Sequence, residues 1–171
     1  MKLIKSSFEI LEQAPGLQGL KQAIERAGRT CYKSEEKITE DSCEEFVQRM
    51  VNSGHHAMLE HGTVYLNIPC KLSYNDYGDI EWIVTVGSVS HKDYEENKYT
   101  QVNLVKQHRY AVEANLYVTT NYRVMVENGW LDDLQYQCEP TEHHEKRITV
   151  KFICDRGVSH EFVRHNVLCV A

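Results

Sequence analysis

The stretch DSCEEFVQRMVNSGHHAMLEHGTVYLNIPC, from Asp41 to Cys70, contains the signals of a helix, a polar cluster and a strand in succession. Its first part predicts a helix that Thr39 or Asp41 caps and that ends at Gly54. The apolar residues of this part recur on one helical face, so they should lie in the core. They are Cys43, Phe46, Val47, Met50 and Val51.

The end of the same stretch is typical of a strand. Residues Thr63 to Cys70 are rich in β-branched and aromatic side chains, and we expect Pro69 to close the strand. The histidine-rich cluster between the helix and the strand should therefore be held against a strand.

Toward the N-terminus, residues 2–12 predict another strand, which Pro15 and Gly16 interrupt. Apolar residues then recur at helical spacing, which predicts a short amphipathic helix between Gly16 and Gly28.

Toward the C-terminus the chain alternates irregularly between strands and helices. Strands are expected over residues 80–89, around 103–105 and 112–118, and over 146–155, where alternation indicates a half-buried strand. Helices are expected over residues 121–128, 130–138 and 156–165. Because strands and helices do not alternate regularly, we predict an α+β fold with a mixed or antiparallel sheet flanked by helices.

Composition limits the function classes. The 171 residues match one domain, 1–171, and the net charge of −6 provides no general field for holding nucleic acid, although a local phosphate pocket stays possible. No apolar run reaches 18 residues and no secretory signal is present, so we expect a cytoplasmic protein without membrane contact. The six cysteines lack C-x-x-C spacing and are interpreted as reduced thiols.

The first polar cluster is Gly54 to His61, which holds three histidines and Glu60. Such groups could bind a metal, cap the helix at the surface, or contact a ligand through hydrogen bonds. The spacing argues against zinc, because only His56 and Glu60 are four residues apart. We therefore expect no metal and favour ligand contact.

Two further clusters lie near the C-terminus. Cys138, His143 and His144 stand among glutamates around Pro140, and we interpret this segment as a solvated acidic loop because a fourth metal ligand is missing. In RGVSHEFVRHN, a helix would pair His160 with Arg164 and Glu161 with His165 at i, i+4 spacing. The arginine fork and the imidazole would suit a phosphate, while the structural alternative is a surface ion pair of Arg164 with Glu161.

Three segments of the chain resemble the flavin-dependent thymidylate synthases, whose signature is R-H-R-x-x-S-x-N-x-x-S-x-R. The stretch RGVSHEFVRHNVLCVA resembles the approach to that signature, and RAGRTCYKSEEKITEDS and SGHHAMLEHGTVYL resemble two upstream segments in the same order. Residues 71–145 resemble a longer middle insertion of one branch of the family.

The resemblance implies an enzyme that converts dUMP to dTMP with FAD, using NADPH as reductant and methylenetetrahydrofolate as carbon donor. It also implies a homotetramer with active sites between subunits. Arg164 and His165 would contact FAD and the nucleotide phosphate, with Asn166 at the third signature position. His55 and Glu60 would hold the flavin near Cys31, and Glu161 would lie at the dUMP site.

The chain departs from the signature in ways that bear on activity. Asn166 stands in place of an arginine, Cys169 in place of the serine and Ala171 in place of the asparagine. The later signature residues are missing and the chain ends on an apolar tail, so we expect a form truncated within the signature, with no dTMP formation by this chain alone. The alternative is a non-catalytic remnant or flavin- and nucleotide-binding module, and a metal-binding protein built on His55, His56 and His61 ranks last.

Overall fold

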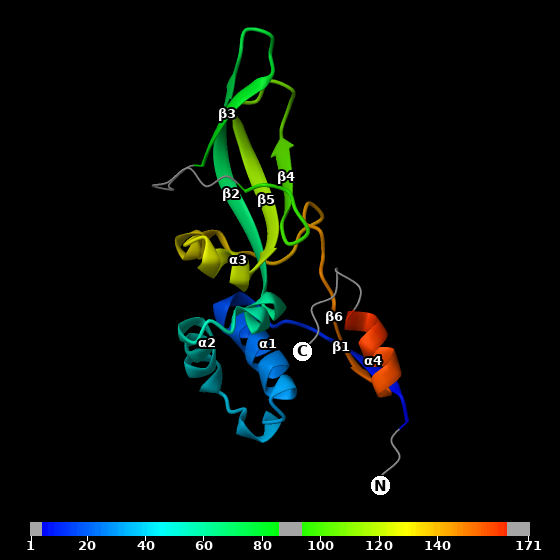
Figure 1. The fold of residues 1–171 in the computed structure, drawn as a ribbon. Coiled ribbons are helices and arrows are strands. Elements are labelled where there is room, and N and C mark those ends of the chain that lie inside the picture. Colours follow the sequence, from blue (N-terminus) through cyan, green and yellow to red (C-terminus); the bar gives the residue numbers. More distant parts are fainter. Residues whose placement is uncertain (1–4, 86–93, 164–171) are drawn as a thin grey trace. The chain divides into compact units, whose positions relative to one another are not determined.

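The computed structural model describes residues 5–85 and 94–163, and Figure 1 traces its helices and strands. The chain divides into two compact units, one formed by Met1–Gly62 with Arg147–Ala171 and the other by Thr63–Lys146. Both contain helices and small antiparallel sheets, which confirms the α+β class. The second unit includes the segment 71–145, whose origin as a family insertion stays a prediction.

The helices of the first unit form where their apolar stripes predict them. Helix α1 covers Gly16–Cys31 and α2 covers Ser42–Asn52, and the 3₁₀ helices η1 (Glu35–Lys37) and η2 (His56–His61) follow them. Their buried side chains form one core, in which Cys43 lies as expected. The largest members of this core are Leu20, Ile24, Phe46 and Leu59.

Two polar contacts in this unit differ from the sequence prediction. Asp41 occupies the position before α2, but its side chain accepts no capping hydrogen bond. Thr39 contributes through its backbone: its N–H donates to Ser42 Oγ, and its carbonyl accepts from the same hydroxyl. Ser42 in turn donates to Glu25, a carboxylate that is 1% exposed and also bonds Arg29 at 3.0 Å. The start of α2 is thus tied to α1 through a buried carboxylate.

The two terminal segments of this unit pair as a small sheet. Strand β1 (Ser7–Leu11) runs antiparallel to β6 (Thr149–Ile153), and Phe8 lies opposite Phe152. The prediction that the second of these strands is half-buried was wrong, because four of its five residues are exposed. The apolar side chains of this two-stranded sheet are in contact with solvent: Phe8 is 70% exposed and Phe152 is 50% exposed. Helix α4 (Arg156–Val163) follows β6.

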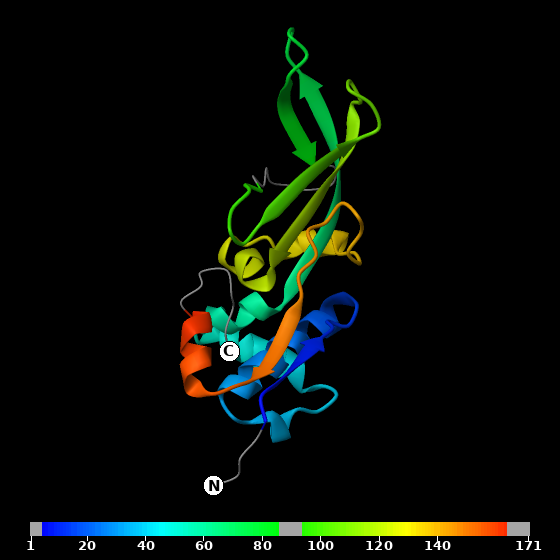
Figure 2. The ribbon, with the colours of Figure 1, turned by 90° about the vertical axis from the view of Figure 1, so that its right-hand side faces the viewer.

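The second unit is organised around a four-stranded antiparallel sheet with the strand order β3-β2-β5-β4 (Figure 2). Its strands are β2 (Thr63–Tyr74), β3 (Ile80–Thr85), β4 (Gln101–Lys106) and β5 (Glu113–Asn121). The prediction that Pro69 closes β2 was wrong: the strand continues to Tyr74, and Pro69 lies opposite Asn115 on β5. The exposed proline is accommodated inside a strand whose buried positions alternate on both sides of it.

The register gives this sheet one apolar and one polar face. Leu66, Val118 and Val102 are neighbours across the adjacent strands β2, β5 and β4. One residue further along, the aligned residues are polar or aromatic, because side chains alternate between the faces of a sheet. This second row contains Asn67, Tyr117 and Asn103.

The second unit also contains two short helices. Helix α3 (Tyr122–Glu127) begins where Asn121 Oδ1 accepts the Val124 N–H at 3.0 Å, and it is followed by Gly129 at a φ of +68°. The second expected helix forms as the 3₁₀ helix η3 (Leu131–Tyr136). Within the described ranges, no helix has the length and apolar character needed to cross a membrane.

Candidate functional site

Two of the segments that resemble the thymidylate synthases meet in the first unit. Cys31 is the last residue of α1, and the hydroxyl of the next residue, Tyr32, lies 2.9 Å from Nδ1 of His55. His55 stands at the start of η2, and the centroids of the two rings are 6.5 Å apart. Cys31, Tyr32 and His55 are all exposed, so a ligand can reach them. We name the two hydrogen-bonded residues the Tyr32–His55 pair; Cys31 lies beside it.

The ends of the two helices hold the pair in place. After α1, the N–H groups of Lys33 and Ser34 bond the carbonyls of Thr30 and Arg29. After α2, those of Gly54 and His55 bond Val51 and Met50 in the same pattern. This pattern requires a left-handed residue, which is Gly54 in the second case and Lys33, at a φ of +50°, in the first.

A lysine in this conformation is less favourable than a glycine by about 1 kcal/mol. The hydrogen bonds that the N–H groups of Lys33 and Ser34 form at this turn therefore have to compensate for the strain. The turn that presents Tyr32 to His55 is kept despite that local cost, which fits the tendency of strained residues to cluster near functional groups.

The rest of the first polar cluster is arranged differently from the sequence expectation. Because η2 is a 3₁₀ helix, residues three apart share a face, so the i, i+4 relation of His56 and Glu60 does not bring them onto one face. Leu59 is buried and anchors the turn. Burial lowers the pKa of His61, and the charge of Glu60 opposes that effect, so the neutral imidazole is favoured.

The predicted nucleotide site is described only in part. Glu161 lies exposed on α4, whereas Arg164, His165 and Asn166 lie outside the described residues, as do the pairings expected of Arg164 and His165. In the part of the chain that the structure describes, no three histidine, cysteine or acidic side chains converge as a metal site.

His144 corrects the interpretation of its segment as a solvated acidic loop. The imidazole is 7% exposed, its Nδ1 accepts the Thr141 N–H at 3.1 Å, and its Nε2 donates to the Leu66 carbonyl at 3.0 Å. Burial lowers the pKa of His144; the hydrogen bond to Leu66 acts in the opposite direction, and His143 adds to the lowering. The neutral side chain therefore fastens the loop to β2, whereas the neighbouring glutamates are exposed as expected.

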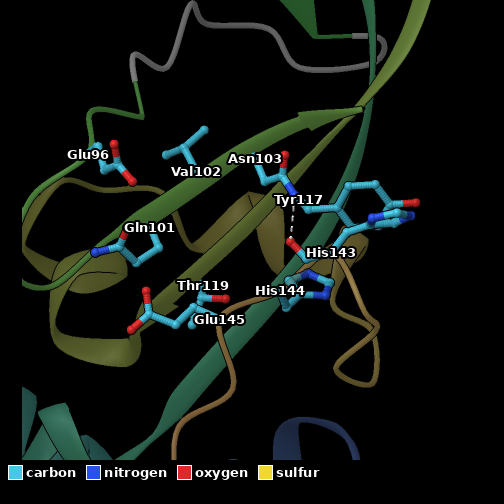
Figure 3. Close-up of a pocket in the computed structure, with 9 residues that line it drawn as sticks. All are labelled: Glu96, Gln101, Val102, Asn103, Tyr117, Thr119, His143, His144 and Glu145. Carbon is cyan, nitrogen blue, oxygen red and sulfur yellow. Dashed lines mark hydrogen bonds between the residues drawn. The ribbon is translucent and has the colours of Figure 1, made fainter. Parts of the chain in front are cut away.

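This loop forms one wall of a pocket of about 270 Å³ that the sequence analysis missed. The floor is the polar face of β4 and β5, where Gln101 pairs with Thr119 and Asn103 with Tyr117 (Figure 3). The only signal in the sequence was the alternation of polar residues along β4 and β5. This alternation indicates a shared polar face only when the register of the two strands is known. The full lining is Glu96, Gln101, Val102, Asn103, Tyr117, Thr119, His143, His144 and Glu145.

Comparisons of this chain with models of known protein families, with curated proteins and with solved structures found no match. The function proposed next therefore rests on the chain's own residues and on the resemblance of its motifs.

Proposed function

We propose that this chain is a flavin-dependent thymidylate synthase-like protein that binds FAD and takes part in the methylation of dUMP to dTMP. The observation that carries the proposal is the hydrogen bond between Tyr32 and His55. It joins the segments 26–42 and 53–66, which resemble the same family independently.

The residues at this place suit a flavin. Tyr32 offers an aromatic face that is about half exposed, and His55 Nε2 has no hydrogen-bond partner among the described residues. When the Tyr32 hydroxyl donates to Nδ1, the imidazole proton sits on Nε2, where it can be donated to a flavin oxygen or a phosphate. A planar, hydrogen-bonding and anionic cofactor can use both groups.

The proposed roles follow the resemblance. Cys31, His55 and Glu60 would hold FAD from the first unit, together with Arg164, His165 and Asn166, and Glu161 and Arg164 would bind dUMP. When bound, reduced FAD supplies the redox chemistry of the one-carbon transfer, with NADPH and methylenetetrahydrofolate as co-substrates. The protein's part is to orient both ligands and to neutralise the phosphate.

The second candidate is a flavin- or nucleotide-binding module without catalysis. It is favoured by the exposure of Tyr32 and His55, because reactive flavin chemistry needs a site from which water is excluded. A homotetramer with sites between subunits, as in the family, would remove this objection.

The decisive experiment measures FAD binding by flavin fluorescence and dTMP formation in the same preparation. His55→Ala should weaken FAD binding about tenfold, as expected for the loss of a charge-assisted or strong hydrogen bond. His108→Ala, which changes an exposed histidine of the second unit, is the matched control and should leave FAD affinity unchanged. Asn166→Arg should strengthen FAD binding by restoring a guanidinium donor.

The outcomes separate the two candidates. FAD binding with dTMP formation supports the enzyme and overturns the expectation that this chain alone forms no dTMP, and FAD binding without dTMP supports the module. Absence of FAD binding, or equal affinities for the protein and the His55→Ala variant, would refute both.

A further inference from the structure

We propose that the pocket of the second unit binds a small organic cation that carries primary ammonium groups, such as a short aliphatic diamine. The site lies on the polar face of the β4–β5 pair and under the 143–145 loop. It shares no residue with the Tyr32–His55 pair, so this inference is independent of the flavin proposal.

The polar groups of the pocket are mainly hydrogen-bond acceptors. Asn103 Nδ2 already donates to the His143 carbonyl at 3.0 Å, and Gln101 Nε2 makes a longer contact of 3.5 Å with the Asn97 carbonyl. Each amide thus uses one of its two N–H donors within the protein and leaves its oxygen as an acceptor. A ligand that satisfies these oxygens has to be rich in donors.

The charges point to the same class of ligand. The carboxylates of Glu96 and Glu145 line the pocket, both residues are exposed, and neither makes an ion pair with a described residue. No lysine or arginine is part of the lining. In Figure 3 the side chains of Glu96, Gln101, Thr119 and Glu145 gather toward one end, and the rings of Tyr117 and His143 lie toward the other. An ammonium group would neutralise the acidic end.

The hydroxyl of Thr119 is a further, independent indication of a ligand. Thr119 is 1% exposed and lines the pocket, yet its Oγ1 has no hydrogen-bond partner. Leaving a buried polar atom unsatisfied costs about 1–3 kcal/mol, so such atoms are rare. A donor that enters beside the exposed rim residues would provide the missing hydrogen bond.

The walls of the pocket are held in place without a ligand. The hydrogen bonds of His144 with Thr141 and Leu66 fix the loop to its own turn and to β2, and Asn103 fixes it to β4. The Tyr117 ring packs between the two histidines, with centroid distances of 4.7 Å to His143 and 5.2 Å to His144. A preformed pocket loses less conformational entropy when a ligand binds. The described side chains do not converge as a metal site, which favours an organic cation over a metal ion.

Titration calorimetry of the full chain with 1,4-diaminobutane tests the proposal, and 1,4-butanediol serves as the uncharged ligand of similar length. We expect the diamine to bind with a dissociation constant at or below about 1 mM and the diol not to bind. Glu96→Gln and Glu145→Gln should each weaken binding about tenfold, because each removes a charge-assisted hydrogen bond. Glu95→Gln removes the same charge from the exposed neighbour of Glu96 outside the pocket, and it should leave the affinity unchanged.

Thr119→Val tests the buried hydroxyl with a side chain of nearly the same shape. It should weaken diamine binding several-fold, and circular dichroism would show whether the variant folds. The exposed glutamate variants keep the test informative if it does not. The proposal is overturned if the diamine fails to bind, if the diol binds equally well, or if Glu95→Gln weakens binding as much as the two pocket variants do.

Discussion

Glu25 illustrates how much a single side chain contributes in this protein. Its carboxylate is almost completely buried in the first unit, where it bonds Arg29 on its own helix and Ser42 at the start of α2. The Arg29 guanidinium also lies over the Phe46 ring, 4.9 Å from its centroid. A charge in this position is tolerated because Arg29 and Ser42 both donate hydrogen bonds to it and Arg29 supplies the counter-charge.

Glu25→Ala should therefore lower the free energy of unfolding by about 3 kcal/mol, because it leaves the partly buried Arg29 guanidinium without its counter-charge. Chemical denaturation measures this change. Glu127→Ala is the control: the side chains of Glu127 and its partner Arg123 are 39% and 35% exposed, so its loss should cost less than about 1 kcal/mol. Similar costs for the two variants would contradict the burial of Glu25.

At the scale of elements, the packed helices and the β1–β6 sheet of the first unit contrast strongly. Phe46 is 1% exposed between α1 and α2, and Gly28 allows its ring to approach closely, since a Cβ at position 28 would lie 2.5 Å from Phe46 Cζ. Phe152 on β6 is instead 50% exposed beside Phe8. A phenylalanine should therefore contribute more to stability in α2 than in β6.

We expect Phe46→Ala to lower the free energy of unfolding by about 3–5 kcal/mol through loss of buried area and formation of a cavity. Phe152→Ala should lower it by less than about 1 kcal/mol, because the side chain is half exposed and its cross-strand contact lies on an exposed face. Urea denaturation of both variants measures the difference. A cost of several kcal/mol for Phe152→Ala would mean that the face of this sheet is covered in solution.

At the scale of the whole molecule, the two histidines with lowered pKa values, His61 and His144, link stability to pH. Each imidazole is neutral in its folded surroundings, whereas the unfolded chain takes up a proton near its ordinary pKa of about 6.5. Below that pH the unfolded state binds more protons than the folded state, so stability rises as the pH rises toward 6.5. Above it, this contribution is fully present.

The melting temperature should therefore fall as the pH is lowered from 7.5 to 5.5, values that bracket a histidine pKa of about 6.5. Thermal denaturation followed by circular dichroism measures this trend. In His144→Gln, which can still donate to the Leu66 carbonyl, the dependence should be weaker but not absent, because His61 remains. An unchanged pH profile in this variant would show that His144 is not the titrating group.

The sequence by itself determined the type and approximate position of most described elements, but not of the 3₁₀ helices η1 and η2. Helical periodicity identified α1, α2 and the core position of Cys43, and β-branched alternation identified the strands of both sheets. These signals are local, because backbone propensity and the spacing of apolar residues act within one element. The resemblance of the motifs placed His55 and Cys31 in candidate segments, but it did not show that Tyr32 reaches His55.

The tertiary structure alone decided which of these residues meet and which are buried. The exposure of β6, the burial of Glu25 and His144, and the pocket around Thr119 all depend on partners that are distant in the sequence. Asn103 and Tyr117, for example, line one pocket because strand register aligns them. Desolvation and hydrogen bonding depend on this three-dimensional environment, so the residue order alone does not reveal them.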